Sequence, residues 1–381
     1  MEPQFCSGRD ALTGEAVSVT FDKHILLVAP ADAPGDLWLA PGFIDLQVNG
    51  FAGVDYNDPD ATRHQIARSL AAQFATGVAR LFPTVITGPP GAMAACLSNL
   101  TAARAIVPGG EAIEGFHVEG PHISPEDGPR GAHPRRWVRP PDFDEFRRWQ
   151  DAACGLIRIV TLSPEWPEAP RYIERITAAG VVASIGHTNA GADQIADAVR
   201  AGATLSTHLG NGAHPLLRRH PNYIWEQLAE DRLTASFIVD GIHLGPAFLK
   251  TALRAKGIGR SVLVTDAATP AGAAPGRYLL GEQPVDLTAD GRVVLAGTDR
   301  LAGSALNMAT GIANLVRIAG LPLADAVRMA TLNPAAAARV AGRTRGLVPG
   351  DRADIVAFRR TPDGAIAVAA TWAGGALVHS S

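Results

Sequence analysis

The chain has 381 residues, of which 47% are hydrophobic, so it can bury a large core as one large domain with a small one or as two domains. Its 34 basic and 37 acidic residues leave a net charge of -3, and no run of Lys or Arg is dense enough to follow a nucleic-acid backbone. These totals argue against a disordered chain, and against nucleic acid or a membrane surface as partners.

The three cysteines, Cys6, Cys96 and Cys154, are widely spaced and form no Cys-x-x-Cys pair. This pattern predicts neither a disulfide framework nor a cysteine zinc site, and it fits a reducing cytoplasm. The first residues lack a basic region followed by an apolar one, and no apolar stretch approaches the roughly 18 residues that span a bilayer. We therefore expect a soluble, unexported protein of the cytoplasm.

In chain order, residues 1–40 predict short strands with turns, as in "AVSVTFDKHILLVAP". Residues 41–344 alternate short β-rich runs with longer segments of helical pattern, and residues 345–381 return to short strands, as in "ADIVAF". We expect the first and last segments to pair as one small β-sandwich domain formed by both chain termini, beside a large domain over residues 41–344.

Eight β-rich runs within the large domain are predicted strands: "GFIDLQV", "ARLFPTVIT", "EGFHVEG", "LIRIVTL", "VVASIGH", "ATLSTHL", "ASFIVDG" and "SVLVTDA". Helical patterns separate most of them, for example over residues 60–76, 167–180, 190–202 and 246–257. Eight βα units of this length predict an α/β fold, a (β/α)8 TIM-type barrel with parallel strands. An open doubly wound sheet is the alternative, but no G-x-G-x-x-G follows an early strand.

Titratable residues follow five of these predicted strands, at the barrel end where active sites are assembled. A single His at a strand tip is more often a hydrogen-bonded structural residue than a ligand. Several such groups at one mouth would be costly to bury without a shared partner, which favours a functional site. The five residues are Glu119, His187, His208, His243 and Asp266.

The residue types predict a chemistry. Glu119, His187 and His208 supply carboxylate and imidazole ligands that suit Zn2+ or a related divalent ion, with one position left for water. Asp266 could take a proton from that water and pass it to a leaving amine. The set therefore indicates hydrolysis of an amide or similar C–N bond.

Eight strings of the chain match a known family in order: "APGFIDLQVNG", "HVEGPHISP", "GHTNA", "THLGN", "DGIHLGP", "LVTDAATPAG", "LAGSALNMATG" and "MATLNPAAAARV". Together they resemble the N-acetylglucosamine-6-phosphate deacetylases of the amidohydrolase superfamily. The resemblance covers most of the chain from about Ala40 to Asp354 and implies release of acetate and glucosamine-6-phosphate from N-acetylglucosamine-6-phosphate.

The resemblance also implies roles for particular residues. Glu119, His187 and His208 would hold one divalent metal ion per subunit, Zn2+ or else Fe2+, Co2+ or Mn2+, and Asp266 would be the catalytic acid/base. The protein would be a homodimer that binds a small amino sugar. The substrate contacts would be Ala132, His133, Asn211, Gly212, Arg219, Asp240, Gly241, Ile242, His243, Leu301, Ala302 and Gly303.

Two absences favour one metal ion over two. Many amidohydrolases carry His-x-His on the first strand, where this chain has Gln47, Val48 and Asn49. The fourth predicted strand, "LIRIVTLSP", offers no Lys that could be carboxylated to bridge two ions. This pattern argues against a dihydroorotase or hydantoinase.

The loop after His208, "LGNGAHPLLRRHPNYIWEQLA", departs from the family pattern. Arg219 lies at the expected distance to hold a phosphate, but Tyr223 and Trp225 add aromatic surface that could stack on a sugar. A deacetylase of another N-acetylated amino sugar, unphosphorylated or galacto-configured, or of an N-acyl amino acid is therefore the alternative. A non-catalytic sugar-binding barrel would require loss of a ligand or of Asp266, and an aldolase would require a Lys at a strand end.

The remaining polar residues of these motifs are expected to have structural or solvated roles. His117 should lie in the barrel wall. Solvated or loop-bracing roles are expected for His122, Glu126, His214 and His220.

Overall fold

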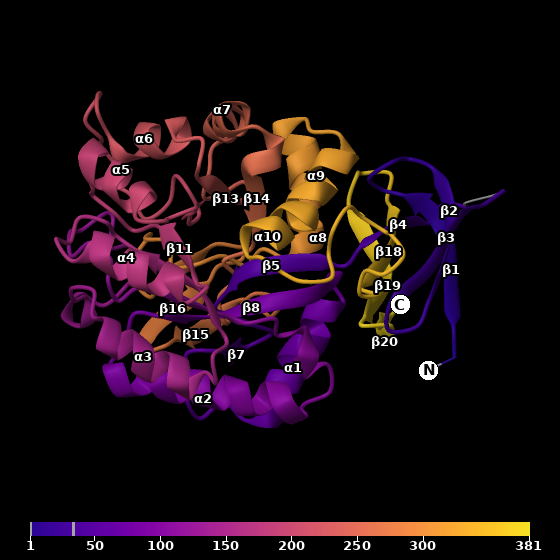
Figure 1. Ribbon diagram of the computed structural model, residues 1–381, viewed down its shortest axis with the longest axis horizontal. Helices are drawn as coiled ribbons and strands as arrows, with labels where there is room; N and C mark the ends of the chain where they lie inside the picture. Colours follow the sequence, from indigo (N-terminus) through magenta and orange to yellow (C-terminus); the bar gives the residue numbers. More distant parts are fainter. Residues whose placement is uncertain (1, 33–34) are drawn as a thin grey trace.

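The structure is a computed structural model that describes residues 2–32 and 35–381. Its central feature is a sheet of eight parallel strands, each hydrogen-bonded to the next in chain order (Figure 1). A parallel bridge between Val48 and Ala267 joins the first strand to the segment after the last and closes the barrel. The strands are β5 (Phe43–Val48), β8 (Val78–Ile86), β9 (Phe116–Glu119), β10 (Ile157–Leu162), β11 (Val182–Ile185), β12 (Leu205–Ser206), β13 (Thr234–Ile238) and β14 (Ser261–Val264).

These eight strands coincide with the eight predicted runs, so the predicted (β/α)8 barrel is confirmed. Nearly every strand residue is buried, as expected for a parallel sheet covered on both faces. Alternate side chains separate into two cores: Ile44 and Leu46 of β5 belong to a cluster inside the barrel, whereas Phe43 belongs to the larger cluster between the barrel and its helices. The sequence runs are therefore mostly apolar and do not alternate, because both faces pack.

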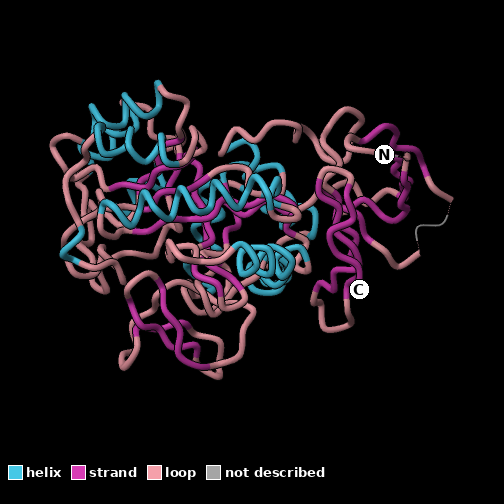
Figure 2. Tube along the Cα trace, turned by 90° about the horizontal axis from the view of Figure 1, so that it is seen from below, coloured by secondary structure: helices cyan, strands magenta, loops and turns pink. Residues whose placement is uncertain are grey.

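Helices surround the barrel (Figures 1 and 2). Where a helical pattern was predicted, the structure places a helix within it; α1, for example, begins after a capping box that Thr62 and Gln65 form. The helices are α1 (Arg63–Phe74), α2 (Pro90–Ile106), α3 (Phe143–Ala152), α4 (Ala169–Ala178), α5 (Ala192–Arg200), α6 (Tyr223–Ala229), α7 (Pro246–Lys256), α8 (Met308–Asn314), α9 (Leu323–Ala330) and α10 (Leu332–Ala337), with short turns η1 (Gly110–Ala112), η2 (Arg135–Trp137), η3 (Ile258–Arg260) and η4 (Leu315–Ala319).

Both termini lie at one end of the molecule, beside the barrel (Figures 1 and 2). There, seven strands form one sheet in the order β20-β19-β18-β4-β1-β2-β3. The rings of Phe21 in β2 and Trp372 in β19 lie 5.6 Å apart although three strands separate β2 from β19, so the sheet folds over on itself into the predicted β-sandwich. The strands are β1 (Gln4–Asp10), β2 (Ala16–Phe21), β3 (Ile25–Pro30), β4 (Trp38–Pro41), β18 (Ile355–Arg360), β19 (Ile366–Ala373) and β20 (Ala376–Ser380).

A buried ion pair connects the barrel to the terminal sheet. Arg80 of β8 is only 2% exposed, and its Nε lies 2.5 Å from Oδ2 of Asp354, which immediately precedes β18. Its Nη1 also donates to the carbonyl of Ala341. The two parts therefore meet through specific polar contacts as well as apolar packing. The predicted domain limits at residues 40 and 345 stay a prediction.

One part of the fold was not predicted from the sequence. After β14 the chain forms a three-stranded antiparallel sheet of β15 (Gly276–Leu280), β16 (Gln283–Leu287) and β17 (Val293–Leu295), and after β5 it forms a two-stranded hairpin of β6 (Gly50–Phe51) and β7 (Val54–Asp55). Apolar side chains of the three-stranded sheet pack on segments next to the barrel mouth. None of the helices in the described part of the chain has the length and apolar composition that crossing a bilayer requires.

Candidate active site

The predicted site residues stand at the carboxyl ends of the barrel strands. Glu119 is the last residue of β9, His187 and His208 each lie two residues beyond a strand, and Asp266 lies two residues beyond β14. All four are buried. His187, His208 and Asp266 adopt positive φ angles of 49°, 29° and 49°, a region that costs energy for residues other than Gly. Such backbone strain is typical of functional sites because the surrounding fold must impose it.

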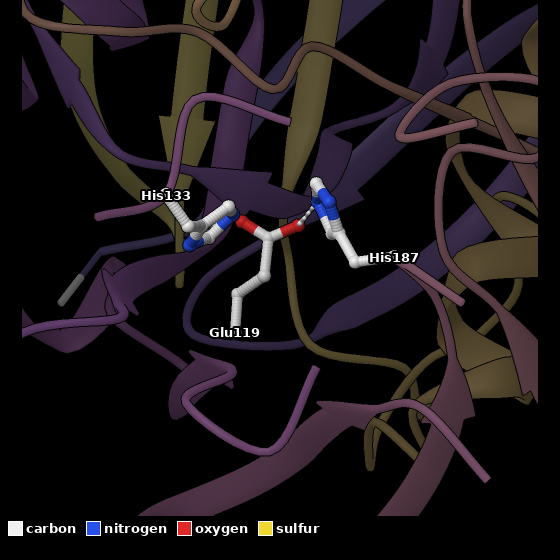
Figure 3. A group of neighbouring side chains, drawn as sticks. All are labelled: Glu119, His133 and His187. Carbon is white, nitrogen blue, oxygen red and sulfur yellow. Dashed lines mark hydrogen bonds and ion pairs between the residues drawn. The ribbon is translucent and has the colours of Figure 1, made fainter. Parts of the chain in front are cut away.

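Three atoms of Glu119, His187 and His208 converge on one point. Glu119 Oε1 lies 3.2 Å from His187 Nε2 and 3.0 Å from His208 Nε2, and the two imidazole nitrogens are 3.1 Å apart. Figure 3 shows the carboxylate of Glu119 beside the ring of His187. Ligands at about 2.0–2.1 Å from a tetrahedral metal are about 3.3 Å from each other, so this triangle has the size of a metal site.

A hydrogen bond of His187 on the side of its ring that points away from the triangle shows which ring nitrogen can bind an ion. His187 Nδ1 lies 2.8 Å from the carbonyl of Pro129, which can only accept, so Nδ1 carries a proton and Nε2 is the ring atom that is free to bind an ion. His208 Nδ1 is buried without a partner among the described residues. When both rings are neutral with their Nε2 atoms unprotonated, one carboxylate oxygen and two imidazole nitrogens face one another at about 3 Å, a donor set that fits a divalent ion.

Two glycines allow the ring of His187 to lie where it does. A Cβ on Gly212, whose φ is +54°, would lie 2.6 Å from His187 Nδ1. A Cβ on Gly131, whose φ is +60°, would lie 3.0 Å from its Cε1. The ring of His187 is thus enclosed by the backbone of two different loops, one at Gly131 and one at Gly212.

His133 stands on the other side of the carboxylate. Its ring is perpendicular to that of His187 at a centroid distance of 4.5 Å, and Figure 3 shows it pointing at Glu119. The ligand atoms of Glu119, His133 and His187 lie within 4.8 Å of one another. This second grouping is looser than the one with His208. Burial lowers the pKa of His133 to about 3, which keeps its ring neutral.

Asp266 is held by two amides from strand β5. Its Oδ1 accepts from Asn49 Nδ2 at 2.7 Å and from Gln47 Nε2 at 3.1 Å. The same Nε2 donates to Glu119 Oε1 at 2.8 Å. The uncharged amide of Gln47 thus lies between the two carboxylates and hydrogen-bonds both of them. Oδ2 of Asp266 has no hydrogen-bond partner among the residues described. Gln47 and Asn49 therefore position Asp266, and they occupy the place where many amidohydrolases have the two histidines that bind a second metal ion.

The pKa values of the two carboxylates, Asp266 and Glu119, are shifted in opposite directions. Burial, and after it the nearby charge of Glu119, raise the pKa of Asp266 to about 6. Burial alone would also raise the pKa of Glu119, but the hydrogen bonds and charges of His187 and His208 outweigh it and hold that pKa well below its usual value. Glu119 is thus a permanent anion, while Asp266 is poised to exchange a proton near neutral pH.

The site opens into a cavity of about 870 Å³. Of the predicted substrate contacts, those that line it are Ala132, His133, Asn211, Gly212, His243, Leu301, Ala302 and Gly303. Asp240, Gly241 and Ile242 do not line it. The carboxylate of Asp240 instead accepts from His243 Nδ1 at 2.6 Å, so its contribution is to orient the His243 ring that does.

The loop after His208 differs from expectation. Arg219 is exposed and does not line the cavity; its carbonyl accepts from the side chain of Asn222, the residue that caps α6. Tyr223 is buried, and its hydroxyl binds the backbone and ring of His214. Trp225 is 46% exposed and also lies outside the lining. The two aromatic residues are therefore not a stacking surface of this cavity.

The other polar residues have structural roles. His117 is buried in the barrel wall between the carbonyl of Leu46 and the hydroxyl of Thr161. His122 is fully buried and stacks on Trp149, so the expectation of a solvated role is wrong and that of loop bracing is confirmed. The remaining loop residues also conform: Glu126 pairs with His214 at 3.3 Å, and His220 is exposed.

Several lining residues were missed from the sequence. Leu280, Gln283, Leu295 and Arg300 belong to the three-stranded sheet and the turn that follows it. The available signal was the strand-like stretch "GRYLLGEQPVDL" between two turn-forming segments, but nothing in it indicates that this sheet faces the barrel mouth.

The fold and the donor set define a metal-dependent hydrolase, and residues 38–378 match the model of the amidohydrolase family. Similar proteins include N-acetylglucosamine-6-phosphate deacetylases of Bacillus subtilis (34% identical, covering 85% of this chain and 81% of the relative) and Homo sapiens (36%, covering 89% and 83%). A Mycobacterium smegmatis N-acetyl-D-glucosamine-6-phosphate deacetylase, solved as an aspartate-to-alanine mutant in complex with N-acetyl-D-glucosamine-6-phosphate, superimposes with a TM-score of 0.89 at 32% identity over 100% of both chains. The chain therefore belongs to the N-acetylglucosamine-6-phosphate deacetylase family within the amidohydrolases.

Proposed function

We propose that the protein removes the N-acetyl group of N-acetylglucosamine-6-phosphate by hydrolysis, which yields glucosamine-6-phosphate and acetate. The observation that carries this proposal is the position of Asp266: a carboxylate with a raised pKa and an open Oδ2, at the base of a cavity large enough for a sugar phosphate, next to a metal-sized triangle of donor atoms. The named relatives, which cover most of the chain, support the same substrate.

Glu119, His187 and His208 would hold one divalent ion, and we take it to be Zn2+. When bound, such an ion lowers the pKa of a water molecule and polarises an amide carbonyl. Asp266 Oδ2 then accepts the proton of the attacking water and delivers it to the departing amine nitrogen. Asn49 and Gln47 hold Oδ1 throughout, so the proton moves on and off Oδ2 without rotation of the carboxylate.

Two histidines are placed to recognise the substrate. His133 is neutral and its Nδ1 has no partner among the described residues, so the ring can hydrogen-bond the acetyl carbonyl. His243 lines the cavity, and with its Nδ1 bound to Asp240 it can turn Nε2 to a sugar hydroxyl. We further propose that the protein is a homodimer and functions in the cytoplasm.

One observation favours a second candidate, the unphosphorylated amino sugar. The predicted phosphate ligand, Arg219, lies outside the cavity lining. The two candidates are distinguished by measuring acetate release from N-acetylglucosamine-6-phosphate, N-acetylglucosamine and N-acetylgalactosamine-6-phosphate side by side with the metal-loaded enzyme. The proposal predicts the highest kcat/KM for N-acetylglucosamine-6-phosphate, and a higher value for the unphosphorylated sugar would transfer the assignment to it.

A further inference from the structure

A network of buried hydroxyl groups lies on the inner face of the barrel wall, next to the candidate metal site. Thr161 Oγ1, on β10, is 2.7 Å from His117 Nε2 and 2.6 Å from Thr207 Oγ1. Thr207 Oγ1 is in turn 2.6 Å from Ser184 Oγ. Ile159, on the same face of β10 as Thr161, belongs to the apolar cluster inside the barrel. All four polar side chains are buried, so these four residues, the hydroxyl network, make their contacts away from solvent.

The hydroxyl network has a consistent arrangement of donors and acceptors. The carbonyl of Leu46, 3.0 Å from His117 Nδ1, can only accept, so Nδ1 donates to it. Nε2 of the neutral ring then accepts from the hydroxyl of Thr161, which accepts from Thr207, and Thr207 accepts from Ser184. Each hydroxyl has a single proton to donate. Removing the hydroxyl of Thr161 would therefore leave a buried acceptor on one side and a buried donor on the other without their partner.

The hydroxyl network is also close in sequence to the proposed metal ligands. On three strands a member precedes a ligand: His117 comes two residues before Glu119, Ser184 three before His187, and Thr207 one before His208. The strand of Thr161 differs, because no residue of β10 lines the cavity. It lies between the strands that lead to Glu119 and His187, since β10 pairs with both β9 and β11.

The backbone beside two of the ligands contacts Thr161 directly. Gly120, which follows Glu119, donates from its N–H to the carbonyl of Thr161 at 3.0 Å. Gly186, which precedes His187, packs so closely that a Cβ on it would lie 2.8 Å from Thr161 Cγ2. Thr161 is therefore in contact with the chain where it leaves β9 and where it leaves β11.

We propose that Thr161 is a positioning residue for the metal site: through the hydroxyl network it fixes the spacing of the three ligands and so sets their affinity for a divalent ion. The inference rests on the proposed metal site, and it concerns a residue that acts through the ligands. Ligand atoms bind an ion at distances within about 0.2 Å of their ideal values, so small displacements of the strand ends weaken binding. Loss of groups that orient metal ligands typically weakens metal binding about 10- to 100-fold.

The test measures the Kd for Zn2+, by competition with a chromophoric chelator, in wild type, Thr161→Val and Thr161→Ser. Val has a shape close to that of Thr but no hydroxyl, so Zn2+ should bind about 10- to 100-fold more weakly to Thr161→Val. Thr161→Ser keeps the hydroxyl and should recover most of the affinity. The visible spectrum of the Co2+-loaded protein depends on ligand geometry, and it should change in Thr161→Val and resemble wild type in Thr161→Ser.

Thr371→Val is the matched control. Thr371 is also a fully buried strand residue, and its hydroxyl donates to the carbonyl of Phe74 at 2.8 Å, but it lies in β19 of the terminal sheet. This variant should unfold at a lower urea concentration than wild type and bind Zn2+ as wild type does. An equal loss of Zn2+ affinity in Thr371→Val would show that general destabilisation is the cause and would overturn the inference.

Wild-type Zn2+ affinity in Thr161→Val would also overturn the inference. If that variant does not fold, Ser184→Ala serves instead: it removes the first donor of the hydroxyl network and should weaken Zn2+ binding, and an unchanged Kd would count against the inference in the same way. A wild-type protein that binds no divalent ion would refute the metal site itself, on which the inference rests.

Discussion

Replacing Asp266 with Asn tests the role of this carboxylate with little change of shape. The carboxamide oxygen can still accept from Asn49 and Gln47, so the side chain should keep its orientation. The amide nitrogen then replaces Oδ2, the atom that we expect to carry the proton. General acid–base catalysis contributes about 10^2- to 10^4-fold, or about 3 to 5 kcal/mol of activation free energy, and kcat should fall by that amount.

The assay is acetate release under saturating substrate, with metal content measured on the same samples. Metal content should stay near that of wild type because the ligand atoms of Glu119, His187 and His208 are untouched. In wild type the base is ionised above its raised pKa, so kcat/KM should fall as the pH drops through about 6, and this limb should be absent in Asp266→Asn. Asp10→Asn, which alters a buried carboxylate of the terminal sheet, is the matched control and should retain turnover. Near-normal turnover of Asp266→Asn with metal bound would refute the assignment and make His133 the first alternative.

The remaining predictions concern stability and metal affinity. Burial raises the pKa of Asp45 from 3.8 to about 7 despite hydrogen bonds from Thr265, so the folded protein retains a proton that the unfolded chain releases. Stability should therefore fall by about 4 kcal/mol as pH rises from about 4 to 7, and Asp45→Asn should flatten this slope in urea unfolding; an equal slope in the variant would contradict it. Gly212→Ala should displace the ring of His187 and weaken metal binding about 10- to 100-fold in a metal titration, whereas Gly91→Ala, with open space around its Cβ, should not; equal affinities would show that the ring has room to move.

The barrel could be predicted because each of its strands is visible in the sequence as a short run of consecutive, mostly apolar residues. Each strand is buried on both faces, so runs such as "SVLV" in β14 are mostly apolar and stand out from the helical segments between them. Glu119, His187, His208 and Asp266 could be predicted for the same reason: once the strands are located, the barrel topology brings their ends to one mouth.

The rest depends on contacts that sequence order does not contain. The position of β15 and β16 over the mouth follows from the packing of their apolar side chains against Ala268 and Ala302, which no pattern within the two strands indicates. The positive φ of His187 is imposed by its surroundings, since isolated histidine avoids that region. Arg219 was expected at the phosphate from spacing alone, and spacing does not show that its side chain is exposed and outside the lining of the cavity.

Elemental analysis of the purified protein shows directly whether Glu119, His187 and His208 form a one-metal hydrolytic centre. We expect about one divalent ion per chain, and we expect both the ion and acetate release to be lost in His187→Ala and in His208→Ala. His220→Ala, which changes an exposed loop histidine, is the control that should keep both. Two tightly held ions per chain, or wild-type turnover by either of the first two variants without metal, would contradict such a centre.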